Sequence, residues 1–217
     1  MCQSFSMKLD HVSYAVLNNE LGDTVQRIGA ELGASFIDGG KHPRFGTRNF
    51  ILPLSNGSYI EVVAPLDHPA AESVPFGQAV RRRAESGGGW MSWALQVDDL
   101  SPLESRIGRD AGEGHRVRPD GVDIRWNQIG VIDLLEDPQL PFFIKWNDLG
   151  QHPSKSGSNP ISITQIALSG EKSAVSSWLD SSFDVVTNEV NLVWVNEDED
   201  GITSVSFKTP NGEIVID

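Results

Sequence analysis

The sequence predicts an α+β protein made of tandem β-α-β-β-β units, and three observations support this class. Runs with strand-like patterns outnumber helical runs, and a helical run follows the first strand of each group. The same order of elements recurs three times along the 217 residues. The 21 glycines and 12 prolines are typical of a chain with many turns and short strands rather than a helical bundle.

The first unit spans residues 8–64. Its expected elements are a strand, a helix, a second strand and a hairpin, over residues 8–16, 20–32, 34–38, 47–54 and 58–64. Apolar residues at helical spacing from Leu21 to Leu32 favour the helix, and Gly33 ends it. Asn56-Gly57 is a strong hairpin-turn signal, whereas residues 39–43 are expected to form a loop.

The second unit spans residues 90–147 and follows a polar stretch with one short helix over residues 76–86. Its expected elements are a strand, a helix and two strands, over residues 90–97, 102–109, 122–131 and 141–147. Ser101 can cap the helix, and a loop rich in Gly, Arg and Pro is expected over residues 110–121. We expect the two units to share one domain over residues 8–149.

Residues 150–160 have the composition of a linker, and a third unit follows over residues 161–217. Its expected elements are a strand, a helix and three strands, over residues 161–168, 171–179, 183–195, 202–208 and 212–217. We interpret it as a degenerate copy that either pairs within the chain or packs against a second chain. Because an odd number of units leaves strand edges open, we expect a homodimer.

Charge and cysteine content argue against several classes of function. Lys plus Arg number 17 against 30 Asp plus Glu, and the formal charge of −13 disfavours binding to nucleic acid or to an anionic membrane. The single cysteine, Cys2, allows no intrachain disulfide, and no apolar run is long enough for a transmembrane helix. A start without a signal-peptide core favours a cytoplasmic protein with a flexible N-terminus over residues 1–7.

Two polar residues inside apolar strands are the best site candidates. Alternation places Leu9, His11 and Ser13 on one face of the first strand, and Glu61 lies within the last strand of the same unit. Burial of an imidazole or a carboxylate is costly unless the group is paired, hydrogen-bonded or bound to a metal. The sequence therefore assigns His11 and Glu61 a catalytic role.

Laying the three units over one another gives corresponding positions in each first and last strand. The separations along the chain are similar for three pairs: His11 and Glu61, Ser92 and Lys145, and Gln165 and Glu213. A register shift of two residues would replace Lys145 by Phe143. The second unit thus supplies a poor ligand and a cation where the first supplies two good metal ligands.

The tandem units, with His on a first strand and Glu on a last strand, resemble the vicinal oxygen chelate (VOC) superfamily. The signature segments are Leu9-Asp10-His11-Val12 and Tyr59-Ile60-Glu61-Val62-Val63. Two longer stretches, residues 36–50 and 137–143, resemble a bacterial glyoxalase-like domain subgroup. The resemblance covers residues 8–148 and implies paired units that curl into a half-open barrel around a ligand cavity.

The resemblance also implies a divalent metal ion, such as Zn, Fe, Mn or Ni, held between units and chelated by two substrate oxygens. In this chain His11 and Glu61 would be ligands from the first unit, and Gln165 and Glu213 would offer a second half from the third unit. Two protein ligands rarely hold a metal tightly. The alternative is a metal-free cavity in which Glu61 pairs with Lys145 and His11 is hydrogen-bonded nearby.

Further residues are candidates for binding a substrate. Arginine side chains at a cavity suit a carboxylate or a phosphate, and tryptophans can line its wall. The candidates are Arg44, Arg48, Trp90, Ser92, Arg125, Gln128 and Lys145, with Trp126 beside Gln128 on one strand face. Each arginine could instead face outward and pair with surface acids. His42, His68 and His115 lie in expected loops and are expected to be exposed, although His42 or His68 could instead reach the barrel mouth and complete a metal site.

These observations support two functions. The first is an enzyme, a lyase, isomerase or dioxygenase, that acts on a small oxygenated and anionic molecule through His11 and Glu61. The alternative is a protein that binds or sequesters a small molecule without metal and without turnover. No nucleophile elbow, phosphate-binding loop, dinucleotide-binding glycine pattern or Cys/His zinc cluster is present in the sequence.

Overall fold

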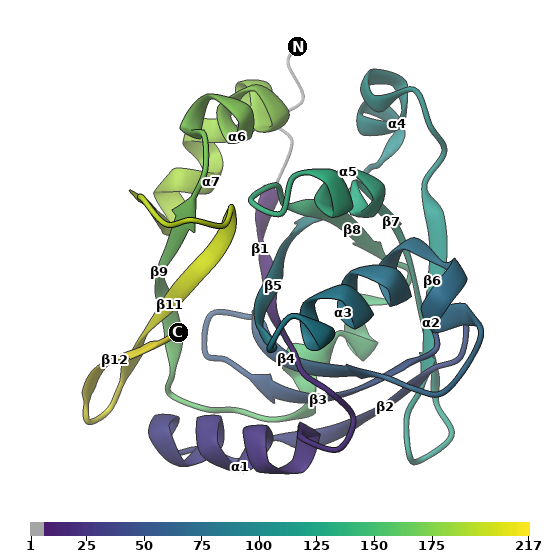
Figure 1. Ribbon diagram of the computed structural model, residues 1–217, viewed down its shortest axis with the longest axis vertical. Helices are drawn as coiled ribbons and strands as arrows, with labels where there is room; N and C mark the ends of the chain where they lie inside the picture. The colour runs from purple at the N-terminus through teal and green to yellow at the C-terminus, as the bar shows by residue number, and fades with distance from the viewer. Residues whose placement is uncertain (1–6) are drawn as a thin grey trace.

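The computed structural model describes residues 7–217, and it contains one closed eight-stranded barrel and one separate four-stranded sheet. In Figure 1 the four-stranded sheet lies to the left of the barrel, and helix α3 crosses the opening that faces the viewer. The α+β class with tandem β-α-β-β-β units is confirmed. The barrel is closed rather than half-open, because Lys41 pairs with Val117 and joins the two ends of the sheet.

The first unit forms one half of the barrel. Its elements are β1 (Met7–Ala15), α1 (Leu21–Leu32), β2 (Ile37–His42), β3 (Thr47–Pro53) and β4 (Tyr59–Pro65). Gly33 ends α1 in the left-handed conformation, with φ of 67°, as expected for a C-terminal glycine. Residues 1–6 of the expected flexible N-terminus lie outside the described residues, whereas Met7 begins β1 and is buried.

The second unit repeats this architecture after a helical connection. The connection holds α2 (Ala70–Ser73) and α3 (Pro75–Glu85). The unit holds β5 (Gly89–Val97), α4 (Ser101–Ile107), β6 (Gly112–Val117), β7 (Asp123–Ile129), α5 (Val131–Glu136) and β8 (Phe142–Trp146). Each unit arranges its strands in the order first, last, third, second, and antiparallel pairing of β1 with β5 joins the two halves.

Two strands run through segments expected to be loops. β2 continues through Gly39 and Gly40, and β6 occupies residues 112–117. Both segments are poor in strand-forming residues, but their glycines admit close neighbours. A Cβ atom on Gly114 would lie 2.4 Å from the Trp126 ring, so only glycine allows the indole to lie across this strand.

The third unit has the expected order of elements with one helix added, and its strands pair in a different order. Its elements are β9 (Ser162–Ser169), α6 (Lys172–Leu179), α7 (Phe183–Glu189), β10 (Asn191–Val195), β11 (Gly201–Thr209) and β12 (Gly212–Ile216), with a 3-10 turn, η3 (Asp180–Ser182), before α7. The sheet order is β10-β9-β11-β12. The start of the expected strand 183–195 is helix α7, which buries Val186 while its neighbours stay more exposed.

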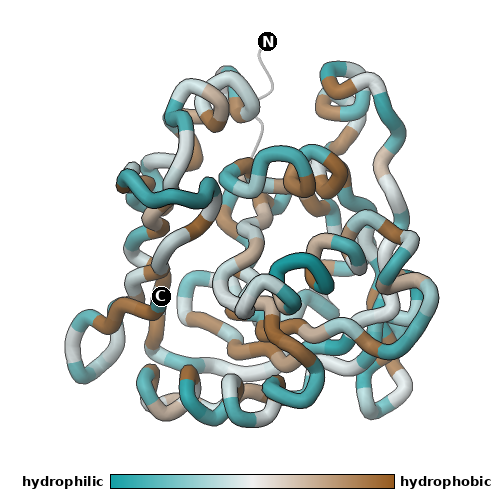
Figure 2. The backbone as a smooth tube through the Cα atoms, in the orientation of Figure 1, coloured by the Kyte–Doolittle hydropathy of each residue, from teal (hydrophilic) through white to brown (hydrophobic). Residues whose placement is uncertain are grey.

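This sheet covers the outside of the barrel, chiefly β5 and β1. Trp90 of β5 contacts the Phe207 ring at 6.2 Å between centroids, and its Nε1 donates to the carbonyl of Ile216 at 2.8 Å. Trp178 of α6 likewise donates to the carbonyl of Pro141 at 2.8 Å. Figure 2 shows apolar residues along the strands and a strongly hydrophilic segment between β10 and β11. One hydrophobic core therefore fills the barrel, and another joins its outer face to the third unit.

Residues 150–160 connect the barrel to the third unit, but they are packed rather than extended as a free linker. They contain most of η1 (Leu149–Gln151) and all of η2 (Pro153–Ser156), two short 3-10 helices. His152 and Pro153 are buried, and the His152 ring contacts Tyr59 and Trp146 at centroid distances of 5.6 and 5.1 Å. This segment therefore contributes to the barrel interior. No helix in residues 7–217 is long and apolar enough to cross a membrane.

Candidate active site

A β-bulge in β1 turns two consecutive side chains toward the barrel interior. Leu9 pairs with Leu95 and His11 pairs with Ala94, which leaves Asp10 as the extra residue. A bulge of this kind interrupts strict alternation, so Asp10 and His11 both contribute to one polar network. Simple alternation wrongly grouped Leu9 with His11, because Leu9 belongs to the core outside the barrel.

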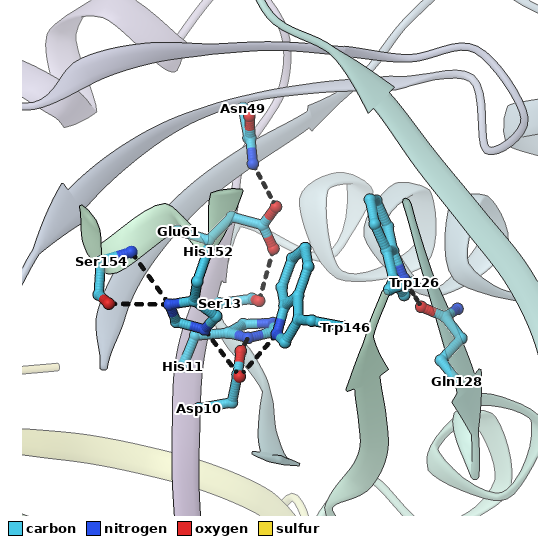
Figure 3. Close-up of polar contacts among 10 residues, drawn as sticks. All are labelled: Asp10, His11, Ser13, Asn49, Glu61, Trp126, Gln128, Trp146, His152 and Ser154. Atoms are coloured by element: carbon cyan, nitrogen blue, oxygen red, sulfur yellow. Dashed lines mark hydrogen bonds and ion pairs between the residues drawn. The ribbon is translucent and has the colours of Figure 1, made fainter. Parts of the chain in front are cut away.

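Asp10 is the centre of this network and is fully buried. Its Oδ1 lies 2.6 Å from Nδ1 of His11, and its Oδ2 accepts from Nε1 of Trp146 at 2.9 Å. Nε2 of His152 lies 3.0 Å from the same Oδ2. Figure 3 shows the three rings converging on the carboxylate. Burial alone raises the pKa of Asp10, but the hydrogen bonds from His11 and His152 outweigh it and hold that pKa well below its usual value.

The hydrogen bonds fix the tautomers of both histidines. The backbone N–H of Ser154 donates to Nδ1 of His152 at 3.2 Å, so His152 carries its proton on Nε2 and donates it to Asp10. An ionised Asp10 only accepts hydrogen bonds, so His11 donates from Nδ1. Nε2 of His11 is then left with a lone pair, and its ring stacks on Tyr59 at 4.6 Å. This arrangement suits a general base.

Glu61 lies on β4, the strand that pairs with β1 in parallel, and is also buried. Its Oε2 accepts from Oγ of Ser13 at 2.7 Å, and its Oε1 accepts from Nδ2 of Asn49 at 2.6 Å. Both carboxylate oxygens therefore have donors, as a buried carboxylate requires. The expected ion pair between Glu61 and Lys145 is absent, since no ion pair of Lys145 occurs within the described chain.

His11 and Glu61 line one small chamber inside the barrel. Its volume is about 20 Å³, enough for a water molecule, so a larger ligand enters only when the surrounding side chains move. Aromatic side chains fill most of the interior around it. The chamber residues are His11, His42, Phe45, Asn49, Tyr59, Glu61, Phe76, Arg116, Trp126, Gln128, Phe142, Ile144 and Trp146.

His42, expected to be exposed, is buried in this chamber with Nδ1 2.9 Å from Oγ1 of Thr47. Burial lowers the pKa of His42 to about 4, an effect that the negative charge of Glu61 opposes and the positive charge of Arg116 reinforces. His42 is therefore neutral near pH 7. His68 is exposed as expected, and His115 lies on the outside of β6 beside Asp123 at 2.8 Å.

A groove of about 250 Å³ adjoins the chamber and shares Phe45, Phe76 and Gln128 with it. Arg44 and Arg109 also line this groove. Gln128 accepts a hydrogen bond from Nε1 of Trp126 at 2.7 Å, which holds its amide at the boundary between the two spaces. The groove is thus the side from which a small molecule can approach the chamber.

The structure brings only some of the candidate substrate-binding residues to these two spaces. Gln128 lines both, and Arg44 lines the groove while pairing with Glu113 at 3.1 Å. Ser92 is buried on β5, which β1 separates from β4. Its Oγ has no hydrogen-bond partner among residues 7–217.

The other candidates lie elsewhere because strand alternation turns them to the outer face. Arg48 pairs with Asp38 at 3.3 Å, and Arg125 pairs with Asp123 at 2.6 Å. Lys145 lies in an outer groove because its neighbours Ile144 and Trp146 face inward. Trp90 packs against the four-stranded sheet of the third unit, as described above.

Gln165 and Glu213 do not reach the barrel chamber. Gln165 lies on β9 and accepts from Nδ2 of Asn191 at 3.0 Å, and Glu213 lies on β12 and accepts from Thr164 at 3.2 Å. β11 separates these two strands. The sheet order of the third unit therefore prevents it from acting as a second half of a metal site.

The donor set in the barrel does not fit a resident divalent ion. Within the described part of the chain no three His, Cys, Asp or Glu side chains are placed to hold a metal. His11 and Glu61 alone are fewer than the three ligands of a typical catalytic site, and both oxygens of Glu61 already accept hydrogen bonds. The arrangement instead fits proton transfer by side chains.

Comparison with known proteins identifies the class of fold. The chain has the VOC architecture, and the model of the glyoxalase-like domain family matches residues 9–183, so the protein belongs to this family. A hypothetical protein from Staphylococcus aureus superposes with a TM-score of 0.59 at 16% identity, over 97% of this chain and 84% of that one. No curated protein matches the sequence.

Two further similar structures are methylmalonyl-CoA epimerases. The enzyme from Mycobacterium tuberculosis has a TM-score of 0.41 and 22% identity, over 64% of this chain and 85% of that one. A variant from Streptomyces coelicolor, in complex with 2-nitronate-propionyl-CoA, has a TM-score of 0.42 and 18% identity, over 65% and 94%. At this level of identity the similarity concerns the fold only.

Several residues of the network were not identified from the sequence. They are Asp10, Asn49, Arg116, Trp146 and His152. The adjacent Asp10-His11 pair was the one usable signal, since two polar residues in succession are unusual in a buried strand. His152 and Arg116 gave no such signal, because His152 lies in a segment with the composition of a linker and Arg116 in one with the composition of a loop.

Proposed function

We propose that this protein is an enzyme of the isomerase or lyase type that moves a proton on a small, oxygenated and anionic molecule, with His11 as the general base. The observation that carries the proposal is the buried Asp10-His11 pair, in which Asp10 holds the proton on Nδ1 and leaves Nε2 able to accept another. A dioxygenase would need a redox metal, and the donor set described above gives it no support.

The geometry suggests how the proton would be held. When Nε2 of His11 takes a proton from an acidic C–H group, the negative charge of Asp10, 2.6 Å away, stabilises the imidazolium that forms. Glu61 lies one cross-strand step from His11, since Ser13 pairs with Glu61 and His11 with Tyr59. Glu61 accepts hydrogen bonds at both oxygens and so has no proton to give; the proton that Nε2 of His11 has taken returns from His11 to another atom of the same molecule. The groove beside Phe76 supplies the route for the substrate.

Proton exchange with solvent tests this proposal directly. Small 2-oxo and 2-hydroxy carboxylates and dicarbonyls are incubated with the protein in D₂O, and loss of the α-proton signal is followed by NMR. We expect exchange with at least one compound, slowed about 100-fold or more in H11Q. The variant H68Q, which changes an exposed histidine outside the chamber, is the matched control and keeps the full rate.

A second candidate function is binding without turnover. It is favoured by the aromatic lining of the chamber, which includes Trp126 and Trp146. Saturable changes in tryptophan fluorescence with compounds that undergo no proton exchange would support this candidate over the enzyme.

We further propose that the protein is a cytoplasmic homodimer that acts on a small molecule rather than on nucleic acid or a membrane. The charge of −13 supports the choice of a small molecule. The exposed Val215 on edge strand β12 supports the homodimer.

A further inference from the structure

Arg116 is a buried cation that the proposed proton transfer does not use. It lies on β6 with 2% of its surface exposed, and it lines the chamber together with His11 and Glu61. Its Nη1 donates to the carbonyl of Gly39 at 3.0 Å. Its Nε and Nη2 have no hydrogen-bond partner, and Arg116 forms no ion pair with any described residue.

The carboxylates nearest in the network are already occupied. Glu61 accepts from Ser13 and Asn49, and Asp10 accepts from His11, Trp146 and His152. His42 is neutral near pH 7 and offers no negative charge. A buried guanidinium without a partner costs several kcal/mol, and burial correspondingly lowers the pKa of Arg116. The negative charges of Glu61 and Asp38 act on Arg116 without a hydrogen bond, but its Nε and Nη2 have no acceptor among the described residues, and an anion would supply one.

The two unpartnered nitrogens also have the right chemistry for one particular anion. Nε and Nη2 lie on the same edge of a guanidinium group, and two parallel N–H donors on one edge match the two oxygens of a carboxylate. We propose that Arg116 is the carboxylate anchor of the chamber and that the ligand is a small carboxylic acid whose head group binds this edge. The part of this inference that concerns turnover rests on the proposed function, whereas the binding site does not.

The lack of a side chain at Gly39 also supports the assignment of Arg116. A Cβ atom on Gly39 would lie 2.0 Å from Oδ1 of Asn49 and 2.6 Å from Nη1 of Arg116. The absence of a side chain at Gly39 is therefore what allows the guanidinium to lie inside the barrel beside Asn49. Oδ1 of Asn49 also lacks a partner within residues 7–217, and it can accept from a hydroxyl group on the same ligand.

Binding of the smallest carboxylates tests the anchor. Thermal unfolding of the full chain is measured with increasing formate or acetate, with acetamide as the neutral isostere and chloride as an anion without two oxygens. We expect formate and acetate to raise the Tm saturably, acetamide to have no effect, and R116M to weaken formate binding tenfold or more. R118M, which removes a half-buried arginine that follows the last residue of the same strand and pairs with Asp120, keeps full binding.

Two further measurements separate this inference from a purely structural role. R116M without any anion is expected to be at least as stable as the original chain, because the cost of burying the charge exceeds the attraction of Glu61 and Asp38. If R116M does not fold, R116K is tested instead, because it keeps the positive charge but lacks the two parallel N–H donors of the guanidinium group. R116K is expected to lose carboxylate binding while keeping any response to chloride. Equal binding of formate by R116M or R116K, an equal response to chloride and formate, or no saturable shift with either carboxylate would overturn the assignment.

The outcomes also distinguish the anchor from the proposed enzyme. Carboxylate binding that depends on Arg116, without proton exchange for any compound, would leave the anchor standing and remove the proposed function. Proton exchange that depends on His11, with an unchanged KM in R116M, would leave the function standing and remove the anchor.

Discussion

Asp10 holds three aromatic donors around one buried carboxylate, and this makes it the most consequential single residue of the site. His11, Trp146 and His152 come from β1, β8 and the segment after β8, so the contacts of one side chain join distant parts of the chain. The charge of Asp10 sets the tautomer of His11, whereas the backbone N–H of Ser154 sets that of His152.

Replacing this carboxylate by an amide is expected to be strongly destabilising. In D10N the NH₂ group faces N–H donors, so at least one hydrogen bond becomes a repulsion between donors, and we expect a loss of about 3 kcal/mol in the free energy of unfolding. Urea unfolding measures this loss, and D67N, at an exposed aspartate, is the control. Equal midpoints for the two variants would contradict the role of Asp10.

His42 makes the stability of the protein depend on pH. Its pKa is about 4 in the folded protein against an ordinary value of 6.5, so the unfolded chain binds more protons between these values. Stability is therefore full above pH 6.5 and decreases as the pH falls toward 4, by on the order of 3 kcal/mol. Urea unfolding at several pH values measures this slope. H42Q, which cannot titrate, is expected to flatten it; an unchanged slope would count against the assignment.

Single residues also mark how far the sequence alone could predict the site. His11 and Glu61 were identified because a polar side chain within an apolar strand needs a partner, and they do line one chamber. The bulge that turns Asp10 inward cannot be inferred from strand alternation. The alignment of the units gives the separation of residues along the chain but not the face of the strand on which each lies. Lys145 is therefore predicted to face inward, whereas Ile144 and Trp146 occupy the inner face instead.

At the scale of elements, helix α3 closes one opening of the barrel. Phe76, Ala79 and Val80 of this helix belong to the core inside the barrel, and the Phe76 ring contacts Phe45 at 5.2 Å and Phe142 at 6.3 Å. Phe76 also separates the small chamber from the larger groove. The position of this one ring therefore decides how open the chamber is.

Removing that ring is expected to open the chamber at a cost in stability. F76A should lower the free energy of unfolding by about 3 kcal/mol, as other buried phenylalanines do. It should also increase acrylamide quenching of tryptophan fluorescence, since Trp126 and Trp146 line the chamber. F36A, which loses packing near α1 and leaves the chamber intact, is the control. Similar quenching in both variants would show that Phe76 is not the barrier.

The elements that the sequence predicted best are those with strong local signals. α1, with its apolar spacing and Gly33, and the β3-β4 hairpin, with Asn56-Gly57, are present at nearly the expected bounds. β2 and β6 were missed because their glycines are typical of loops. Their strand conformation comes from pairing with β3 and β7, which are neighbours in the folded sheet.

At the scale of the whole molecule, the third unit covers an outer face of the barrel that would otherwise be apolar. A chain that ends after residue 150 would expose Trp90 and Phe143 and would also lack His152. We expect this fragment to aggregate or to bind a hydrophobic dye, with loss of its near-UV circular dichroism. V215D in the full chain, which changes an exposed residue of β12, is expected to remain folded. A well-folded fragment would contradict this account.

The order of synthesis adds a constraint to this architecture. β1 is synthesised before both strands with which it pairs, β4 and β5. Asp10 forms its hydrogen bond with His152 across 142 positions of the chain. Contacts so distant in sequence form slowly, because a long loop must close before they contribute any stability. Shorter nascent chains therefore hold Asp10 and His11 with no barrel around them, and the buried network exists only after both halves of the barrel have left the ribosome.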